Sequence, residues 1–296
     1  MTHKHLIAAI ETGGTKLLYR LADAEGAVIG EGRFDTATPD ASVALLAGAV
    51  RQAMPPGVAL AAVGVASFGP IVVDPASPRY GRMLATTKAG WSGYDLRGAI
   101  AAELGAPVLV DSDVNAAALA EQQVGAGRGQ RLVAYVTVGT GIGGGLSIAG
   151  ETLKGNPHPE IGHIRLVRRP GDAFASSCPF HADCAEGLVA GPAIRRRLGD
   201  IADLADAPDV LALAADYLAQ LCATLTLAWS PDCIVLGGGV LRAHGLIDAV
   251  RTELQAQLGT YGAAADIDPA TYLVPAALAD AGLEGAMLMA RAAAGK

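Results

Sequence analysis

Two glycine-rich turns, each joining a pair of apolar segments, constrain this sequence more than any other feature. The first is GGTK at 13–16, between strand-like segments at 6–11 and 17–23. The second lies within LVAYVTVGTGIGGGLSIAG at 132–150 and repeats the order strand, turn, strand. An ordinary P-loop passes from a strand into a helix, so these turns are of another kind. The repeat predicts two related α/β halves, each with one hairpin that contacts phosphate.

Length and periodicity predict two domains. The chain has 296 residues, of which 51% are hydrophobic and 17% charged, so it can form two substantial cores. We expect one lobe at 1–112 plus a C-terminal helix at about 279–296, and a second lobe at 113–278 with a metal-binding loop. Helical spacing is found at 41–54, 96–104, 114–124, about 190–198, 209–229, 246–257 and 281–294, and further strands are expected at 28–34, 61–67, 108–113 and 233–240.

Charge and composition exclude several functions. A net charge of −7 and an aromatic content of 4% leave no basic stripe or stacking platform for nucleic acid. The apolar run at 58–65 is far shorter than the roughly 20 residues of a spanning helix, so no membrane association is expected. The N-terminus reaches Glu11 before any signal-peptide core could form, and the cytoplasm is therefore the expected location.

Three glycine turns are candidate phosphate contacts. Glycines let backbone N–H groups approach an anion, and in GGTK Thr15 and Lys16 add a hydroxyl and a cation, although a plain hairpin would also accept Gly-Gly. The second turn has five glycines in the seven positions 139–145, more than a hairpin requires. Gly237–Gly239 follows a strand, where α/β folds bind ligands, although a simple strand–helix turn would look similar.

The segment DSDVN at 111–115 is the candidate for the chemistry. It lies where a strand ends and a helix begins, and Ser or Asp is also favoured there as a helix cap. One cap does not account for two aspartates and an asparagine. In phosphoryl transfer to a hydroxyl, a carboxylate can accept the proton. We expect Asp113 to be that base and Asp111 to be structural.

A cluster of cysteines and histidines predicts a metal site. Cys178, His181 and Cys184 form C-x2-H-x2-C, and His163 lies upstream. Two thiolates and two imidazoles suit tetrahedral Zn²⁺, and four protein ligands leave no open position for catalysis. The alternative is two packed cysteines and two surface histidines. Polar residues in or beside this loop are candidates for binding a sugar, namely Glu160, His163, Glu186 and, with less support, His158. Cys222 and Cys233 lie in apolar runs and are expected in the core.

Taken in order, these motifs resemble the ROK family (repressors, open reading frames, sugar kinases). The resemblance is carried by ETGGTK, DSDVNAAALAE, VTVGTGIGGG, HPEIGH, CPFHADCAEG and VLGGG and runs over essentially the whole chain. Within the family, ASFGPI, SPRYGRMLATTKAGW and CPFH, in place of the more usual CGCG, resemble the bacterial fructokinases.

The resemblance implies an actin-like ATPase (ribonuclease H-like) fold with two lobes around a cleft, Mg²⁺-ATP as phosphoryl donor and a structural Zn²⁺. It implies Asp113 as catalytic base and zinc ligands at His163, Cys178, His181 and Cys184. The implied nucleotide contacts are Gly13, Gly14, Thr15, Lys16, Thr137, Gly139, Thr140, Gly141, Pro192, Gly237, Gly238 and Gly239. The implied sugar contacts are Gly69, Pro70, Asp113, Glu160, His163 and Glu186.

The expected activity is ATP-dependent phosphorylation of a hexose, D-fructose to fructose 6-phosphate. A glucokinase, mannokinase or broad hexokinase is the alternative, because the sequence departs from the family pattern at Glu11, usually Asp, and at Ser112, often Asn. A sugar-responsive repressor is disfavoured, since only ten residues precede Glu11 and no basic helix is present. A homodimer is expected from similar kinases.

Overall fold

The computed structural model describes residues 5–156, 158–260 and 262–295, which form two compact units. Unit 1 comprises the chain up to Ala120, Thr152–His158 and the chain from Ala279 onward. Unit 2 comprises Glu121–Glu151 and Pro159–Leu278. Unit 1 therefore includes residues 113–120 and 152–158, which the sequence-based division placed in the second lobe.

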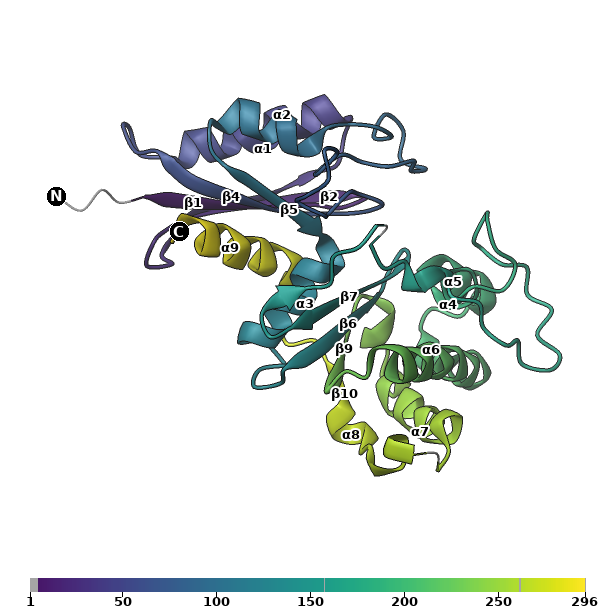
Figure 1. Ribbon diagram of the computed structural model, residues 1–296. Coiled ribbons are helices and arrows are strands. Elements are labelled where there is room, and N and C mark those ends of the chain that lie inside the picture. Colours follow the sequence, from purple (N-terminus) through teal and green to yellow (C-terminus); the bar gives the residue numbers. More distant parts are fainter. Residues whose placement is uncertain (1–4, 157, 261, 296) are drawn as a thin grey trace. The chain divides into compact units, whose positions relative to one another are not determined.

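Unit 1 is built on a five-stranded sheet in the order β3-β2-β1-β4-β5. Its hairpins are antiparallel, whereas β4 and β5 run parallel to β1. Helices α1 and α2 cover one face and α9 the other (Figure 1), and all seven residues of β1 are buried between them, as in a doubly covered sheet. The elements are β1 (Leu6–Thr12), β2 (Lys16–Asp23), β3 (Val28–Asp35), α1 (Pro39–Ala53), β4 (Leu60–Ser67), α2 (Leu96–Leu104), β5 (Val108–Ser112) and α9 (Ala281–Ala294).

Unit 2 contains the second five-stranded sheet, in the order β10-β9-β6-β7-β8. Its strands are β6 (Leu132–Val138), β7 (Ile142–Ile148), β8 (Glu151–Thr152), β9 (Cys233–Gly237) and β10 (Leu273–Pro275). Its helices are α4 (Ala185–Val189), α5 (Gly191–Leu198), α6 (Pro208–Trp229), α7 (Leu246–Leu258) and α8 (Pro269–Tyr272), while α3 (Asp113–Val124) begins in unit 1. Short 3-10 turns lie at η1 (Ile161–His163), η2 (Leu204–Asp206), η3 (Val240–Arg242) and η4 (Gly262–Asp266).

The two sheets have the same topology. In each, an antiparallel hairpin (β1–β2 or β6–β7) is followed by a strand (β4 or β9) that pairs in parallel with the first strand of the hairpin. The internal repeat expected from the glycine turns is therefore present in the fold, and the α/β class is confirmed.

Two predicted strand ends were wrong for local reasons. The strand expected at 108–113 ends at Ser112, because Asp113 already belongs to α3. The strand expected at 233–240 ends at Gly237, because Gly238 has φ of 98°, which strand geometry does not accommodate.

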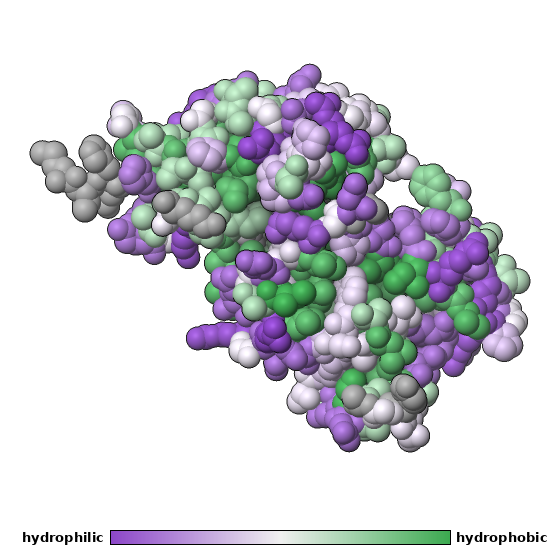
Figure 2. All heavy atoms as spheres, in the orientation of Figure 1, coloured by the Kyte–Doolittle hydropathy of each residue, from purple (hydrophilic) through white to green (hydrophobic). Residues whose placement is uncertain are grey.

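Helix α6 is the one described helix that is long and apolar enough to cross a membrane by length and composition, with a mean hydropathy of 1.6 over its best window. Because 61% of that window is buried inside the structure, it is explained as a core helix. Large hydrophobic side chains exposed among the described residues are scattered, from Ile29 at 40% to Val167 at 78%. Figure 2 likewise shows hydrophilic and hydrophobic residues interspersed on the visible face.

Candidate active site and metal centre

Three strand ends in unit 1 bring predicted site residues to one edge of the sheet. Thr12 of β1 pairs with Ser67 of β4, and Ser67 pairs with Ser112 of β5. Neighbouring strands lie about 4.8 Å apart, so Thr12 and Ser112 are separated by roughly 10 Å. The GGTK turn, Gly69-Pro70 and Asp113 each follow one of these ends and therefore share the edge.

The GGTK turn has bonded carbonyls, and two of its N–H groups have no identified acceptor among the described residues. The turn is closed by the N–H of Gly13, which donates to the carbonyl of Lys16 at 2.8 Å. The carbonyls of Gly13 and Thr15 accept from Thr36, through its hydroxyl at 2.8 Å and its N–H at 3.1 Å. Across the described residues, no hydrogen-bond acceptor is identified for the N–H groups of Gly14 and Thr15. A Cβ at Gly14 would meet no atom within 4 Å. Free N–H groups with occupied carbonyls favour an anion.

Glu11, at the end of β1, is a buried carboxylate beside this turn. Its side chain lies 3.6 Å from the Lys16 ammonium, which also lies 3.3 Å from Asp280. Within the described structure its Oε2 is buried and has no hydrogen-bond partner. Burial raises the pKa of Glu11, while the Lys16 charge opposes that rise. In the sequence, Glu11 stands out only as a departure from the family pattern, although its position two residues before Gly13 could have marked it as functional.

Asp113 is the first residue of α3, and a neighbour caps the helix in its place. The Ser112 hydroxyl accepts the N–H of Asn115 at 3.2 Å, which is the N-cap bond. The half-buried Asp113 side chain accepts the next N–H of the chain, from Val114 at 2.9 Å. Because Ser112 makes the N-cap hydrogen bond, helix capping is not the reason for an aspartate at position 113.

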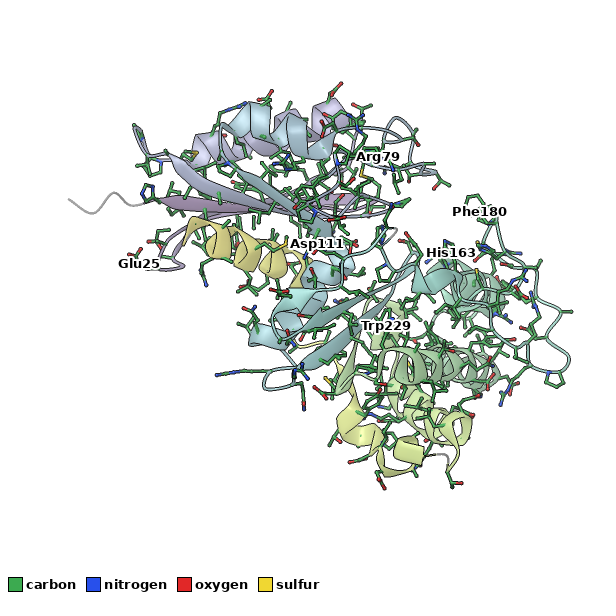
Figure 3. The ribbon with its side chains drawn as sticks, in the orientation of Figure 1. Glu25, Arg79, Asp111, His163, Phe180 and Trp229 are labelled. Atoms are coloured by element: carbon green, nitrogen blue, oxygen red, sulfur yellow. The ribbon has the colours of Figure 1, made fainter. Side chains whose placement is uncertain are left out.

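Asp111 is enclosed by polar partners. Its side chain is fully buried and accepts from the Asn115 amide at 2.9 Å and the Thr152 hydroxyl at 2.5 Å, with Lys154 at 3.5 Å (Figure 3). These bonds tie the end of β5 to α3 and to the 152–154 segment. Such a fully engaged carboxylate fits the structural role expected for it.

Unit 2 has an equivalent edge at the ends of β6 and β9. Thr137 pairs with Gly237, so the turns 139–141 and 237–239 lie together. A Cβ at Gly238 would lie 2.4 Å from the Val138 carbonyl, so the two turns are too close for any side chain there. In the turn at 139–141, the carbonyl of Gly139 accepts the N–H of Gly191 at 2.7 Å. This bond brings the start of α5, with Pro192, to the same edge.

Two glycines of the second turn are explained by contacts within the protein. A Cβ at Gly141 would lie 2.5 Å from the Glu186 carboxylate, and one at Gly144 would lie 2.2 Å from the Ile161 side chain. Gly139, in contrast, has open space where a side chain would be, as Gly239 does. The glycine content of this turn therefore reflects packing at 141 and 144, and room for a ligand remains at 139.

The predicted sugar-binding residues of unit 2 lie around the same turn. Glu186, at the start of α4, accepts the N–H of Ile142 at 3.0 Å. Glu160 precedes the 3-10 turn η1 and His163 ends it, and Ile161 of this turn packs on Gly144. His158 is not part of this group: it belongs to unit 1, is 5% exposed, and its Nε2 accepts the N–H of Ile71 at 3.2 Å.

The four predicted metal ligands come together in unit 2. The candidate ligand atoms of His163, Cys178, His181 and Cys184 all lie within 4.8 Å of one another. Both histidines direct Nδ1 at the Cys178 sulfur, each at 3.8 Å (His163 is labelled in Figure 3). Around a tetrahedral Zn²⁺ with ordinary bond lengths, sulfur and nitrogen ligands lie about 3.5 Å apart, so the arrangement fits that ion.

The remaining cysteines are core residues. Cys222 and Cys233 are 1% and 2% exposed, as predicted from their apolar surroundings. Burial raises the pKa of the Cys222 thiol to about 12, so this sulfur is inert.

Comparison with known proteins assigns the family. The model of the ROK family matches residues 7–293. The chain belongs to the ROK family. It is 37% identical to a fructokinase from Pediococcus pentosaceus over 97% of this chain and 98% of that protein. A ROK hexokinase from Thermus thermophilus has TM-score 0.76 and 31% identity over 96% of this chain and 97% of the other. A ROK glucokinase from Streptomyces griseus, solved with glucose and AMPPNP, has TM-score 0.75 and 26% identity over 97% of this chain and 99% of the other.

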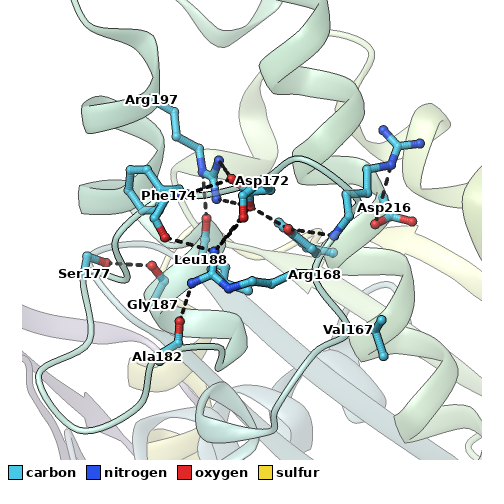
Figure 4. A network of polar contacts seen from close by, with 12 residues as sticks. Val167, Arg168, Asp172, Phe174, Ser177, Ala182, Gly187, Leu188, Arg197 and Asp216 are labelled. Carbon is cyan, nitrogen blue, oxygen red and sulfur yellow. Dashed lines mark hydrogen bonds and ion pairs between the residues drawn. The ribbon is translucent and has the colours of Figure 1, made fainter.

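These matches give this ROK protein the actin-like ATPase fold that the resemblance implied. Inside that fold the metal-binding loop has its own anchor (Figure 4). Arg197 forms a bidentate pair with Asp172 at 2.9 and 3.0 Å, and Tyr217 donates to the same carboxylate at 2.6 Å. Arg168 donates to the carbonyls of Phe174, at 2.9 Å, and Ala182. The loop that carries the candidate metal ligands is thus fixed to α5 and α6 by charged hydrogen bonds.

Proposed function

We propose that the protein is an ATP-dependent sugar kinase that converts D-fructose to fructose 6-phosphate. The observation that carries the proposal is the shared sheet edge in unit 1, where the candidate anion-binding turn and Asp113 follow strands in register, and where Ser112 rather than Asp113 caps the helix. Fructose is preferred over glucose or mannose because the fructokinase relative is 37% identical over nearly its full length, whereas the glucokinase structure is 26% identical.

In the proposed reaction, Asp113 accepts the proton of the sugar hydroxyl as its oxygen attacks the terminal phosphorus of ATP. The new bond joins sugar oxygen to phosphorus, the bond to the bridging oxygen breaks, and ADP leaves. The backbone N–H groups of Gly14 and Thr15 bind phosphoryl oxygens. In unit 2, the nucleotide is assigned to the turns at 137–141 and 237–239 and to Pro192.

Magnesium is proposed as the companion of ATP. The buried Oε2 of Glu11, without a hydrogen-bond partner in the described structure, is a hard oxygen ligand beside the phosphate turn, which suits Mg²⁺. When bound, the ion would neutralise charge on the phosphoryl oxygens. Lys16 adds a second positive charge at this carboxylate.

Zinc is proposed as a structural ion in unit 2. His163 directs Nδ1 at the cysteine cluster, which leaves Nε2 of the same ring available for a sugar hydroxyl. Glu160, which precedes η1, and Glu186, on α4, are the other proposed sugar contacts of unit 2. In unit 1 the proposed sugar contacts are Gly69, Pro70 and Asp113. We further propose that the protein is cytoplasmic, forms a homodimer and has no nucleic-acid or membrane partner. Light scattering on the purified protein would test the homodimer through its molar mass.

Turnover across sugars tests the substrate. We expect kcat/KM with Mg²⁺-ATP to be highest for D-fructose among fructose, mannose, glucose and N-acetylmannosamine. A value for glucose or an amino sugar about tenfold above that for fructose, equivalent to about 1.4 kcal/mol, would show that the assignment is wrong.

Replacing Asp113 with Asn tests the mechanism. The change keeps the shape of the side chain and removes the proton acceptor, so kcat should fall by about 10²–10⁴ with nucleotide affinity unchanged. Ser112→Ala is the matched control: it removes the N-cap and should lower stability by about 1 kcal/mol while kcat changes little. An Asp113→Asn protein that is folded and keeps most of its kcat would refute Asp113 as base.

A further inference from the structure

Lys88 contacts the phosphate turn from the long connection between β4 and α2. Its ammonium donates to the carbonyl of Gly14, the one GGTK carbonyl between those held by Thr36. Gly14 is also one of the two turn residues whose N–H groups have no identified acceptor among the described residues. The contact therefore places a positive charge at the turn that is proposed to bind an anion.

The backbone around Lys88 is fixed. Thr86 and Ser92 exchange two hydrogen bonds of 3.1 Å across this bend, and the N–H of Trp91 donates to the Lys88 carbonyl at 3.2 Å. Trp91 is fully buried, and its indole N–H donates to the Ala37 carbonyl at 3.2 Å. The tryptophan anchors the bend in the core, so only the lysine side chain must be ordered to reach the turn.

The two lysines at the turn differ in their charge environment. Lys16 lies between the carboxylates of Glu11 and Asp280, so its charge is largely compensated. Lys88 forms no ion pair in the part of the chain that the structure describes, and its single identified acceptor is a neutral carbonyl. An ammonium has three donors, so two remain for another ligand.

We propose that Lys88 binds the terminal phosphoryl group of the nucleotide and stabilises its charge during transfer. This inference rests on the proposed kinase function. Lys88 holds the Gly14 carbonyl with one N–H, and its other two N–H groups remain as donors for oxygens of the phosphoryl group. Charge accumulates on the three equatorial oxygens of the phosphoryl group during transfer, and a fixed ammonium there favours the transition state.

Nucleotide affinity without turnover separates this role from a structural one. The non-hydrolysable β,γ-imido analogue of ATP carries the terminal phosphoryl group, and ADP lacks it. Titration of Lys88→Met with each, in the presence of Mg²⁺, should show analogue affinity reduced by about tenfold and ADP affinity changed by less than about twofold. Lys88→Arg should recover most of the analogue affinity, because it retains a cation at this position.

Arg79→Met is the matched control. Arg79 is an exposed cation of the same connection, its side chain forms no identified contact in the described structure, and its replacement changes the net charge equally. It should leave both affinities unchanged. With fructose, Lys88→Met should lower kcat by about 10².

The inference and the function fail in different ways. A wild-type protein that phosphorylates none of the sugars refutes the kinase function. A wild-type kinase whose Lys88→Met variant binds the analogue and ADP in the wild-type ratio refutes the role of Lys88, whether both affinities are kept or both are lost. If Arg79→Met lowers the analogue affinity as much as Lys88→Met does, the role of Lys88 is refuted as well. The loss would then be explained by the change in net charge and not by a contact of Lys88 with the phosphoryl group.

Discussion

Replacing Asp172 with Asn should destabilise unit 2 through the anchor of the metal-binding loop. The Asp172 and Arg197 side chains are each only 8% exposed, and the carboxylate also accepts from Tyr217 and from the N–H of Phe174 at 3.2 Å. An asparagine offers one acceptor oxygen in place of two. Its amide group would face donors, and the buried Arg197 charge would lose its counter-ion.

The size of the effect follows from burial. Breaking a buried pair by neutralising one partner typically costs about 3–5 kcal/mol, whereas an exposed pair contributes about 1 kcal/mol or less. Asp248→Asn is the matched control in the same unit, since Asp248 is 80% exposed and lies 2.9 Å from Arg251. Equilibrium unfolding in urea should therefore show a large loss for Asp172→Asn and a small one for Asp248→Asn.

Acid adds a second measurement. The Arg197 guanidinium holds the pKa of Asp172 well below its usual value of 3.8. The stabilisation is present above that value and is lost as pH falls towards the depressed pKa of the folded protein. The stability difference between wild type and Asp172→Asn should therefore shrink in acid. A difference below about 1 kcal/mol at neutral pH, or one that does not decline in acid, would refute the argument.

Two further predictions concern the carboxylate at the phosphate turn and the metal centre. Burial raises the pKa of Glu11 above its ordinary value of 4.5, so the stability of the wild-type protein should fall as pH rises from 4.5 through the raised pKa. At neutral pH, Glu11→Gln should therefore be more stable than the wild type by about 1–3 kcal/mol. Thermal unfolding should show that gain, and activity should fall with the loss of a Mg²⁺ ligand; a lower melting temperature would contradict it. Purified protein should contain about one Zn²⁺ per chain, lost in Cys178→Ser, and its removal should expose Cys184 to thiol reagents; metal analysis without zinc would contradict the site.

Local patterns predicted most of the fold. Apolar runs and turn residues located the strands of both hairpins within a residue or so, and the helix at 96–104 coincides with α2. Short elements such as α8 and β10 were missed, because four or three residues carry too little periodicity to distinguish them from a loop. Their order comes from tertiary contacts, such as the parallel pairing of β10 with β9.

The candidate site was predicted residue by residue but not contact by contact. The spacing C-x2-H-x2-C predicted a metal site with His163, and the structure brings the four candidate ligand atoms within 4.8 Å of one another. The sequence could not reveal that Ser112 rather than Asp113 caps α3, because both residues are good caps. Nor could it reveal Lys88 at Gly14, since 74 residues separate them and the contact depends on how the connection folds.

The shared topology of the two sheets shows where the halves have diverged. The strand equivalent to β1 is β6, and the strand equivalent to β5 is β10. In unit 1 an acid lies beside the end of each of these strands, Glu11 before Thr12 and Asp113 after Ser112, whereas in unit 2 the strands are followed by glycines, a threonine and alanines. Carboxylates beside a phosphate-binding turn repel the anion, so unit 1 needs compensating charge that unit 2 does not. Lys16 pairs with Glu11 beside β1, so the charge of Lys16 is largely compensated. A second cation without a carboxylate partner is then needed to compensate the charge of the phosphoryl group. Lys88, which contacts the turn at Gly14, is the residue that we propose for this role.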